Sequence, residues 1–271
     1  MSLSSNRDIA AVILAGGMGK RLGGFVEPKP ARMIAGKPLV RWIVETCLEV
    51  VTGPVVVVVP PGEMGGDLVV ERAGSEVITV VQETALGTGH AFLSARSILE
   101  RFDGDLIVTV GDAPALEEED LLALVEEHRE KEATVTLTSA EFDPIPPYGR
   151  VIRDVDGEII ALIEESDASS VQKQIREVAT SQWVFSSPII WPMAKQFQRS
   201  PRTREMYLTD IVAWAKKAGL RVAGWKSVHP EHHLGVNTPE EFAMMEKYLL
   251  QRQAAKNGDA IHEVADARSE G

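Results

Sequence analysis

Short runs of apolar residues alternate with amphipathic segments of helical length through the first half of this chain. Runs such as "IAAVILA" (9–15) and "VVVVV" (55–59) contain no polar residue, as is usual for strands of a parallel sheet with both faces buried. Segments such as 39–50 and 117–131 alternate with such runs and space their apolar residues as helices do. This order is typical of βαβ units and predicts an α/β, doubly wound, mostly parallel, Rossmann-like sheet.

The pattern changes after Pro144, where polar and apolar residues alternate on either side of Asp156-Gly157. This dipeptide is a two-residue turn signal and predicts a β-hairpin. We expect one domain over residues 9–250, in which 141–250 form an inserted β-rich lobe and then return to the sheet. Further elements are predicted as strands at 178–185 and 221–228 and helices at 189–197, 208–218 and from 239 to about 253. Residues 251–271 are predicted to be a polar tail, either frayed or a short docking helix.

The composition argues against several classes of partner. The chain has 28 Lys and Arg residues against 40 Asp and Glu residues, a net charge of -12, which repels nucleic acid and anionic lipid. The single cysteine, Cys47, excludes an intrachain disulfide and suits a reducing compartment. The longest apolar run is too short for a membrane span and no signal-peptide pattern precedes the first strand. We therefore expect a cytoplasmic protein with no nucleic-acid or membrane partner.

A glycine-rich loop with clustered cations follows the first predicted strand. Gly16, Gly17 and Gly19 let backbone amides converge on an anion, and Arg21 and Lys29 can add full charges. The spacing matches neither the P-loop nor the dinucleotide-binding fingerprint. The loop predicts a triphosphate site at the carboxyl end of a strand, with a tight strand-to-helix turn carrying solvated cations as the alternative.

Several motifs together resemble the nucleotidyltransferases that make nucleotide sugars. "LAGGMGKRL", "EPKP" and "AGKPLV" are followed by "ETALGTGHAFLSAR", "VGDAPAL", "PPYGRVIRD", "IEESDAS", "MYLTDIVAWA" and "GVNTPEEFAMME". In this order they are similar to the uridylyltransferase domain of the bifunctional N-acetylglucosamine-1-phosphate uridyltransferase. The resemblance covers about residues 9–250 and implies a nucleotide-binding part at 9–140 and a sugar-binding lobe at 141–250. Since the chain stops where that enzyme's acetyltransferase domain would follow, we expect acetyltransferase activity to be absent.

The resemblance also assigns roles to individual residues. Arg21 and Lys29 would be catalytic, and Asp112 and Asn237 would hold Mg²⁺, a cation that favours oxygen ligands. A turn or helix-cap role is the alternative for both metal ligands. The expected nucleotide-binding residues are Leu14, Ala15, Gly16, Gly17, Gln82, Leu86, Gly87 and Thr88. The expected sugar-phosphate-binding residues are Gly149, Glu164, Tyr207 and Thr209.

Some positions depart from the family pattern. Ala179 replaces the asparagine of an Ile-Asn-Thr-Gly segment that holds the sugar, and we expect Trp183 to add bulk nearby. Ala85 replaces a glutamine beside the base, and Val110 and Ser166 replace a tyrosine and a lysine. These changes predict that N-acetylglucosamine 1-phosphate is not the preferred acceptor.

The predicted activity is Mg²⁺-dependent transfer of a nucleotidyl group from an NTP, UTP in the first place, to a sugar 1-phosphate. A cytidylyl or other nucleotidyl transfer to a different phosphorylated acceptor is one alternative, and a non-catalytic nucleotide-sugar sensor is another. The cluster of His229, Glu231, His232 and His233 is a candidate Zn²⁺ set, although loop histidines are usually solvated. The acidic run 117–133 is expected to be a helix with a solvated face and no catalytic role.

Overall fold

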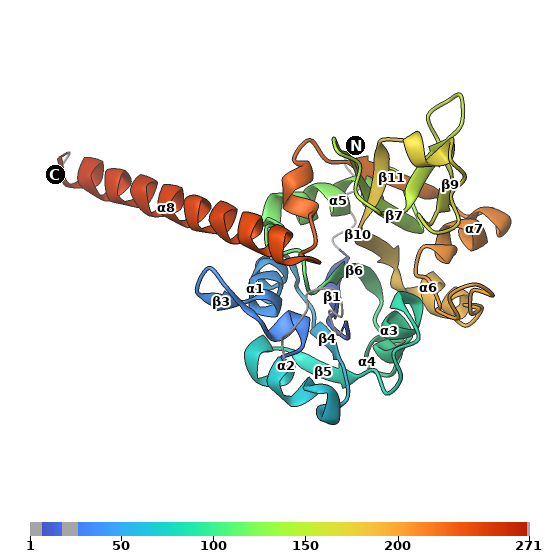
Figure 1. Ribbon diagram of the computed structural model, residues 1–271, viewed down its shortest axis with the longest axis horizontal. Helices are drawn as coiled ribbons and strands as arrows, with labels where there is room; N and C mark the ends of the chain where they lie inside the picture. Colours follow the sequence, from blue (N-terminus) through green and yellow to red (C-terminus); the bar gives the residue numbers. More distant parts are fainter. Residues whose placement is uncertain (1–6, 18–26, 270–271) are drawn as a thin grey trace.

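A computed structural model describes the chain over residues 7–17 and 27–269, with side chains up to Ala255. In the described part, a nine-stranded sheet follows the main path β11-β7-β10-β6-β1-β4-β5 (Figure 1). Neighbours on this path are parallel except at β10, which is antiparallel to both β6 and β7. The strands on this path are β1 (Asp8–Leu14), β4 (Val55–Val59), β5 (Ile78–Val81), β6 (Gly104–Val110), β7 (Val135–Glu141), β10 (Glu177–Ser186) and β11 (Val222–Lys226).

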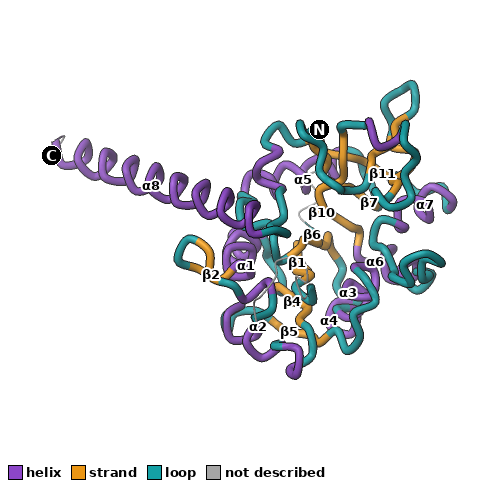
Figure 2. Tube along the Cα trace, viewed as in Figure 1, coloured by secondary structure: helices purple, strands orange, loops and turns teal. Residues whose placement is uncertain are grey.

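Helices cover both faces of this sheet (Figure 2). One face packs against α1 (Leu39–Val50), α2 (Gly66–Ala73) and α5 (Glu118–Glu130). The other packs against α3 (Thr88–Ser94), α4 (Arg96–Leu99), α6 (Ser187–Ala194) and α7 (Asp210–Lys217). The doubly wound α/β class is therefore confirmed. Short elements complete this part of the chain: 3₁₀ helices η2 (Lys29–Ala31), η3 (Gly62–Met64), η4 (Gln172–Gln174) and η5 (Pro230–His233), and the strand pair β2 (Met33–Ile34) and β3 (Lys37–Pro38).

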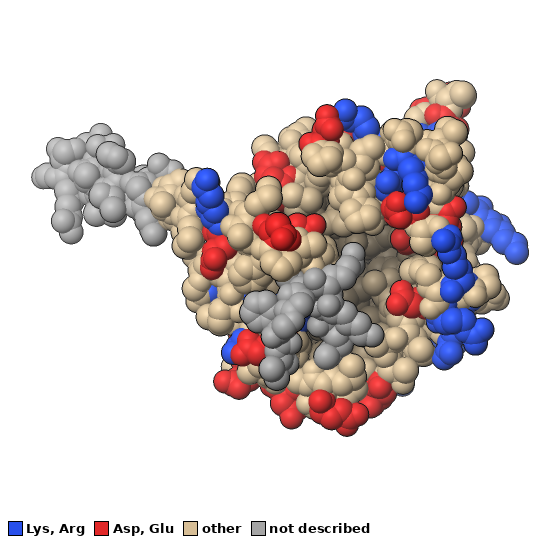
Figure 3. Space-filling view, viewed as in Figure 1, with Lys and Arg blue, Asp and Glu red and all other residues tan. Residues whose placement is uncertain are grey.

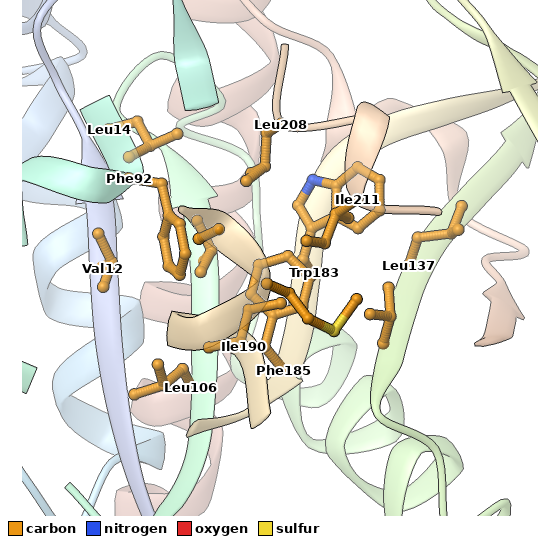
Figure 4. Close-up of a cluster of buried hydrophobic side chains, with 14 of the residues drawn as sticks. Val12, Leu14, Phe92, Leu106, Leu137, Trp183, Phe185, Ile190, Leu208 and Ile211 are labelled. Atoms are coloured by element: carbon orange, nitrogen blue, oxygen red, sulfur yellow. The ribbon is translucent and has the colours of Figure 1, made fainter. Parts of the chain in front are cut away.

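The two faces of β1 explain why its sequence has no polar interruption. Val12 and Leu14 lie in the hydrophobic cluster that contains Phe92, whereas Ala11 and Ile13 lie in the cluster beneath α1 and α5. Figure 4 shows the first of these clusters. Because successive side chains of a strand point to opposite faces, both residue sets must be apolar when helices cover both sides.

The hairpin predicted around Asp156-Gly157 is present, but its loop is longer than the predicted two-residue turn. It consists of β8 (Arg150–Arg153) and β9 (Ile159–Ile163), and Arg153 pairs with Ile159, so that residues 154–158 form the loop. The side chain of Asp154 accepts hydrogen bonds from the amides of Asp156 at 3.0 Å and Glu158 at 2.9 Å. These bonds stabilise a wider turn than the two-residue type. β8 also pairs with β10, which joins the hairpin to the main sheet.

A bulge in β10 precedes a side chain in an unexpected position, that of Trp183. The register with β7 shifts between Ala179 and Trp183, and Ser181 within the bulge has a left-handed φ of 68°. Trp183 is 2% exposed and its ring centroid lies 5.8 Å from that of Phe185 in the core. The expectation that Trp183 adds bulk to a sugar site is therefore wrong, because this side chain is buried in the hydrophobic core.

The last helix, α8 (Pro239–Ser269), runs well beyond the end predicted near Gln253 and projects from the body of the molecule (Figure 1). Residues 251–271 contain no proline, and alanine, lysine, glutamate and arginine favour the helical state. Across the described residues, no helix combines the length and the apolar composition that a membrane span requires.

Candidate active site

Three distant segments bring Lys29, Asp112 and Asn237 together. The ammonium of Lys29 donates to Oδ2 of Asp112 and, at 2.9 Å, to Oδ1 of Asn237. Lys29 is buried, whereas 24% of the Asp112 side chain is exposed, so the cluster opens to solvent on the Asp112 side. A carboxylate and an amide oxygen thus already converge on one cation. Such hard oxygen donors fit Mg²⁺.

Local structure fixes each member of this cluster. Lys29 begins η2 between Pro28 and Pro30, whose rings restrict φ. Asp112 follows β6, and its carbonyl accepts the amide of Val236 at 2.9 Å. Nδ2 of Asn237 donates to the carbonyl of Gly235 at 3.2 Å, which turns Oδ1 toward Lys29.

The helix-cap alternative for Asn237 is resolved by its neighbours. Oγ1 of Thr238 accepts the amide of Glu241 at 3.2 Å, and Oε2 of Glu241 accepts the amide of Thr238 at 3.1 Å. This reciprocal pair is a capping box. The start of α8 is therefore capped by Thr238 and Glu241, and the side chain of Asn237 remains directed at Lys29.

The predicted nucleotide-binding residues meet beside the end of β1. A Cβ added at Gly16 would lie 2.5 Å from Oε1 of Gln82, so only glycine permits this approach. Nε2 of Gln82 donates to the carbonyl of Gly87 at 3.2 Å and lies 3.2 Å from Nδ1 of His90. Because a carbonyl can only accept, the Gln82 amide must point its NH₂ group to Gly87 and its oxygen to Gly16. β1 ends here at Leu14, whose carbonyl accepts the amide of Gly111, and the amide of the following Ala15 donates to the carbonyl of Val58.

Backbone hydrogen bonds lock residues 86–89 to the segment before α7. The amide of Met206 donates to the carbonyl of Leu86 at 2.7 Å, and its own carbonyl accepts the amide of Gly89 at 2.8 Å. Oγ1 of Thr88 accepts the amide of Leu208 at 3.0 Å. Gly87 has φ +100°, and a Cβ there would lie 2.5 Å from the Met206 carbonyl oxygen. The strip expected to bind the nucleotide is thus held rigidly against Tyr207, one of the residues expected to bind the sugar phosphate.

Three of the predicted sugar-phosphate residues lie together, and the fourth faces the same pocket. Oγ1 of Thr209 donates to Oε1 of Glu164 at 2.5 Å, and a Cβ at Gly149 would lie 3.9 Å from Oε2 of Glu164. Glu164, Tyr207 and Thr209 line a pocket of about 400 Å³. Burial raises the pKa of Glu164, and the nearby carboxylates of Asp210, Asp167 and Glu205 add to the effect, against the hydrogen bond from Thr209.

Tyr148 connects this group to the Lys29 cluster. Its hydroxyl accepts the amide of Gly235 at 3.0 Å, and the next residue, Gly149, accepts the amide of Ala179 through its carbonyl at 2.8 Å. Ala179, one of the positions that depart from the family pattern, is therefore hydrogen bonded directly to Gly149. Figure 3 shows that the molecule is hollowed near the centre of the view.

The family assignment follows from comparison with known proteins. A model of the MobA-like NTP transferase domain family matches residues 11–183, more than half of the chain. The chain belongs to this family.

Curated relatives of this NTP transferase domain carry the name bifunctional protein GlmU. The one from Syntrophotalea carbinolica is 37% identical over 245 residues, which are 90% of this chain and 52% of the relative. Those from Brevibacillus brevis and Pelotomaculum thermopropionicum are 32% and 37% identical, again over 90% of this chain, and are covered over 52% and 53% of their length. The chain thus spans about half the length of the curated relatives it matches. The family predicted from the motifs is confirmed.

Not every predicted residue of the NTP transferase domain can be placed. Arg21 and Gly19 lie outside the described residues, and Gly17 is exposed at the edge of the described loop. Conversely, the structure adds His90, Tyr148 and Gly235 to the site. All three occur inside the quoted motifs, as "GTGH", "PPYG" and "LGVN", but their role in orienting other side chains becomes visible only from their hydrogen bonds.

Proposed function

We propose that this chain is a Mg²⁺-dependent nucleotidyltransferase that makes an NDP-sugar, and in particular a UDP-sugar, with release of pyrophosphate. The observation that carries the proposal is the convergence of Lys29, Asp112 and Asn237 from three separate segments, with Asp112 just after the carboxyl end of β6. Membership of the MobA-like NTP transferase domain family supports it.

The reaction needs positioning and charge neutralisation more than covalent chemistry. A phosphate oxygen of the sugar 1-phosphate attacks the α-phosphorus of the NTP and forms a new P–O bond. The bond from the α-phosphorus to the bridging oxygen breaks, and pyrophosphate leaves with both electrons. Lys29 would donate to a phosphate oxygen in this process, and Arg21 would add a second positive charge to the triphosphate.

Asp112 and Asn237 are the residues that would hold Mg²⁺. When bound, the ion supplies positive charge that neutralises the phosphates. The ammonium of Lys29 contacts an oxygen of each of these two residues. We infer that Lys29 exchanges this contact for a phosphate oxygen when the substrates bind.

The orientation of Gln82 supports a uracil base. With its NH₂ group held by Gly87, Gln82 offers its oxygen as an acceptor. Uracil carries a donor at N3 that can use such an acceptor, whereas the N3 of cytosine is itself an acceptor. His90 faces the same amide through Nδ1, and burial together with the charge of Arg199 lowers its pKa, which favours the neutral ring. A neutral Nδ1 acceptor reinforces the direction of the Gln82 amide.

For the acceptor, we propose a hexose 1-phosphate other than the N-acetylated amino sugar. Glu164 and Thr209 would contact sugar hydroxyls, and the backbone of Gly149 would approach the sugar closely. The Ala179 side chain has no amide, so it cannot form a hydrogen bond with the N-acetyl group of the sugar. The site therefore gains no binding energy from that group at this position.

The deciding experiment measures pyrophosphate release for every common NTP against a panel of sugar and alcohol phosphates. UTP with a hexose 1-phosphate should give the highest kcat/KM, and Asp112→Asn should abolish the signal. A preference for CTP with a different phosphorylated acceptor would support the alternative transferase. Tight nucleotide-sugar binding with no release under any condition would identify a sensor and overturn the proposal.

A further inference from the structure

A second group of potential metal ligands lies in η5 and at His229, the residue that precedes it, outside the site described above. Ligand atoms of His229, Glu231 and His232 all lie within 4.8 Å of one another. Nδ1 of His229 is 3.6 Å from Oε1 of Glu231. Two ligands of one tetrahedral Zn²⁺ ion with bonds of about 2.1 Å are separated by about 3.4 Å. The pair therefore already has nearly the spacing that a shared metal ion requires.

The third ligand is oriented by a carboxylate behind it. Nδ1 of His232 lies 2.9 Å from Oδ2 of Asp120, which is 6% exposed. Asp120 in turn is held at the start of α5, where its Oδ2 accepts the amide of Glu117 at 3.1 Å. A carboxylate on one ring nitrogen fixes the tautomer and leaves the other nitrogen, Nε2, as a lone-pair donor. This is the arrangement found behind most metal-bound histidines.

His229 is the ligand whose side chain can rotate to complete the site. Its ring is stacked on that of His232, with centroids 4.9 Å apart and planes at 20°. Its side chain is 57% exposed, so rotation about its side-chain torsions meets little resistance. Such a rotation turns its lone pair toward an ion that Glu231 and His232 hold. The fourth tetrahedral position would face solvent and take a water molecule.

We propose that His229, Glu231 and His232 form a binding site for a divalent transition-metal ion of the Zn²⁺ type. Two imidazoles and a carboxylate suit Zn²⁺, Co²⁺ or Ni²⁺, whereas Mg²⁺ disfavours nitrogen ligands. The site is independent of the proposed Mg²⁺ site in its residues and its chemistry. It is connected to that site through the chain, because η5 leads directly into the segment of Gly235 and Asn237. Metal binding at η5 would therefore stiffen the segment that presents Asn237.

The test uses the full chain, purified without a histidine tag and saturated with Mg²⁺. Equilibrium dialysis with Zn²⁺ should give one bound ion per chain, and Co²⁺ should give the visible absorption bands of a tetrahedral site. Glu231→Gln and His229→Ala change exposed or half-exposed side chains and should each remove this binding. Asp120→Asn keeps the ligands but weakens their support, and should reduce Zn²⁺ affinity by about 10- to 100-fold.

Two controls separate this site from the proposed catalytic one. Asp112→Asn should leave Zn²⁺ binding unchanged, and Glu240→Gln, an exposed carboxylate on α8, should do the same. Circular dichroism of each variant checks that the fold is retained. The proposal is overturned if the unmodified chain binds no Zn²⁺ at micromolar concentration, or if Glu231→Gln and His229→Ala bind it as well as the unmodified chain does.

Discussion

Nζ of Lys29 donates a hydrogen bond of 2.9 Å to Oδ1 of Asn237, although 208 residues separate the two along the chain. The same ammonium is paired with Asp112. The lysine thus occupies the point between the two oxygens that would hold Mg²⁺. Substrate phosphates would relieve this competition, because they offer the ammonium a new partner. Cation and nucleotide binding should therefore be coupled.

Removal of the ammonium should make the metal ligands more available. We expect Lys29→Met to raise the affinity for Mg²⁺ or Mn²⁺ in the absence of nucleotide by about tenfold, which corresponds to one charge-assisted hydrogen bond of about 1.5 kcal/mol. Mn²⁺ binding followed by electron paramagnetic resonance measures this directly. Weaker or unchanged binding in the variant would show that Lys29 does not compete with the metal.

Asp112→Asn and Asn237→Ala should each abolish most turnover while the fold stays intact, because each removes an oxygen ligand or its charge. Pyrophosphate release at saturating Mg²⁺ is the measurement. Asp103→Asn, which alters an exposed carboxylate near the start of β6, is the matched control and should retain full activity. Normal turnover in both site variants would refute the metal assignment.

Ala179→Asn should improve use of N-acetylglucosamine 1-phosphate. One restored neutral hydrogen bond of about 1 kcal/mol limits the gain in kcat/KM to about tenfold. The same variant should gain nothing with a neutral hexose 1-phosphate, which serves as the internal control. If the unmodified chain already prefers the N-acetylated sugar over every other acceptor, the role given to Ala179 is wrong.

His128 should make folding stability sensitive to acid. Burial lowers its pKa from 6.5 to about 4, with Arg7 and Arg129 adding to the effect and Asp105 opposing it. In the unfolded chain the His128 imidazole is protonated below pH 6.5, whereas in the folded chain it is protonated only below about pH 4. The contribution of neutral His128 to the free energy of unfolding is therefore complete above pH 6.5 and decreases as the pH falls toward 4.

Urea unfolding of the unmodified chain and of His128→Gln at pH 7 and pH 5 isolates this effect. The loss of stability between the two pH values should be smaller in the variant by about 1–2 kcal/mol. The variant should be less stable at pH 7, since it loses the contacts of the ring with Thr136 and Ser186. An equal pH dependence in both proteins would contradict the prediction.

Ser181→Gly should stabilise the fold. A left-handed backbone costs a residue with a Cβ about 1–2 kcal/mol. Glycine removes this cost but lowers stability by about 0.4–1 kcal/mol, because its unfolded state has more conformational freedom. The net gain should be about 0.5–1 kcal/mol and raise Tm by a few degrees. Ser181→Ala keeps the Cβ and should show no such gain. Equal melting temperatures for the two variants would mean that the bulge is not strained at Ser181.

Structural features that depend on residues close together in the chain could be predicted from the sequence. The apolar runs at 9–15 and 55–59 predicted buried parallel strands, because burial on both faces leaves no position for a polar side chain. The resemblance in motifs predicted a catalytic role for Lys29 and a metal-binding role for Asp112 and Asn237. The wider loop at 154–158 was missed because the side chain of Asp154 competed with the glycine turn signal.

Residue patterns along the chain were therefore enough to predict the alternation of strands and helices, the family and the types of residue available for phosphate and metal chemistry. The packing of distant segments was needed to place Lys29 between Asp112 and Asn237 and to bury Trp183 in the core. The difference lies in the distance along the chain over which each interaction acts. Periodicity and capping depend on neighbours within a few residues, whereas the partner of a buried charge is chosen by the packing of segments that are distant in the chain.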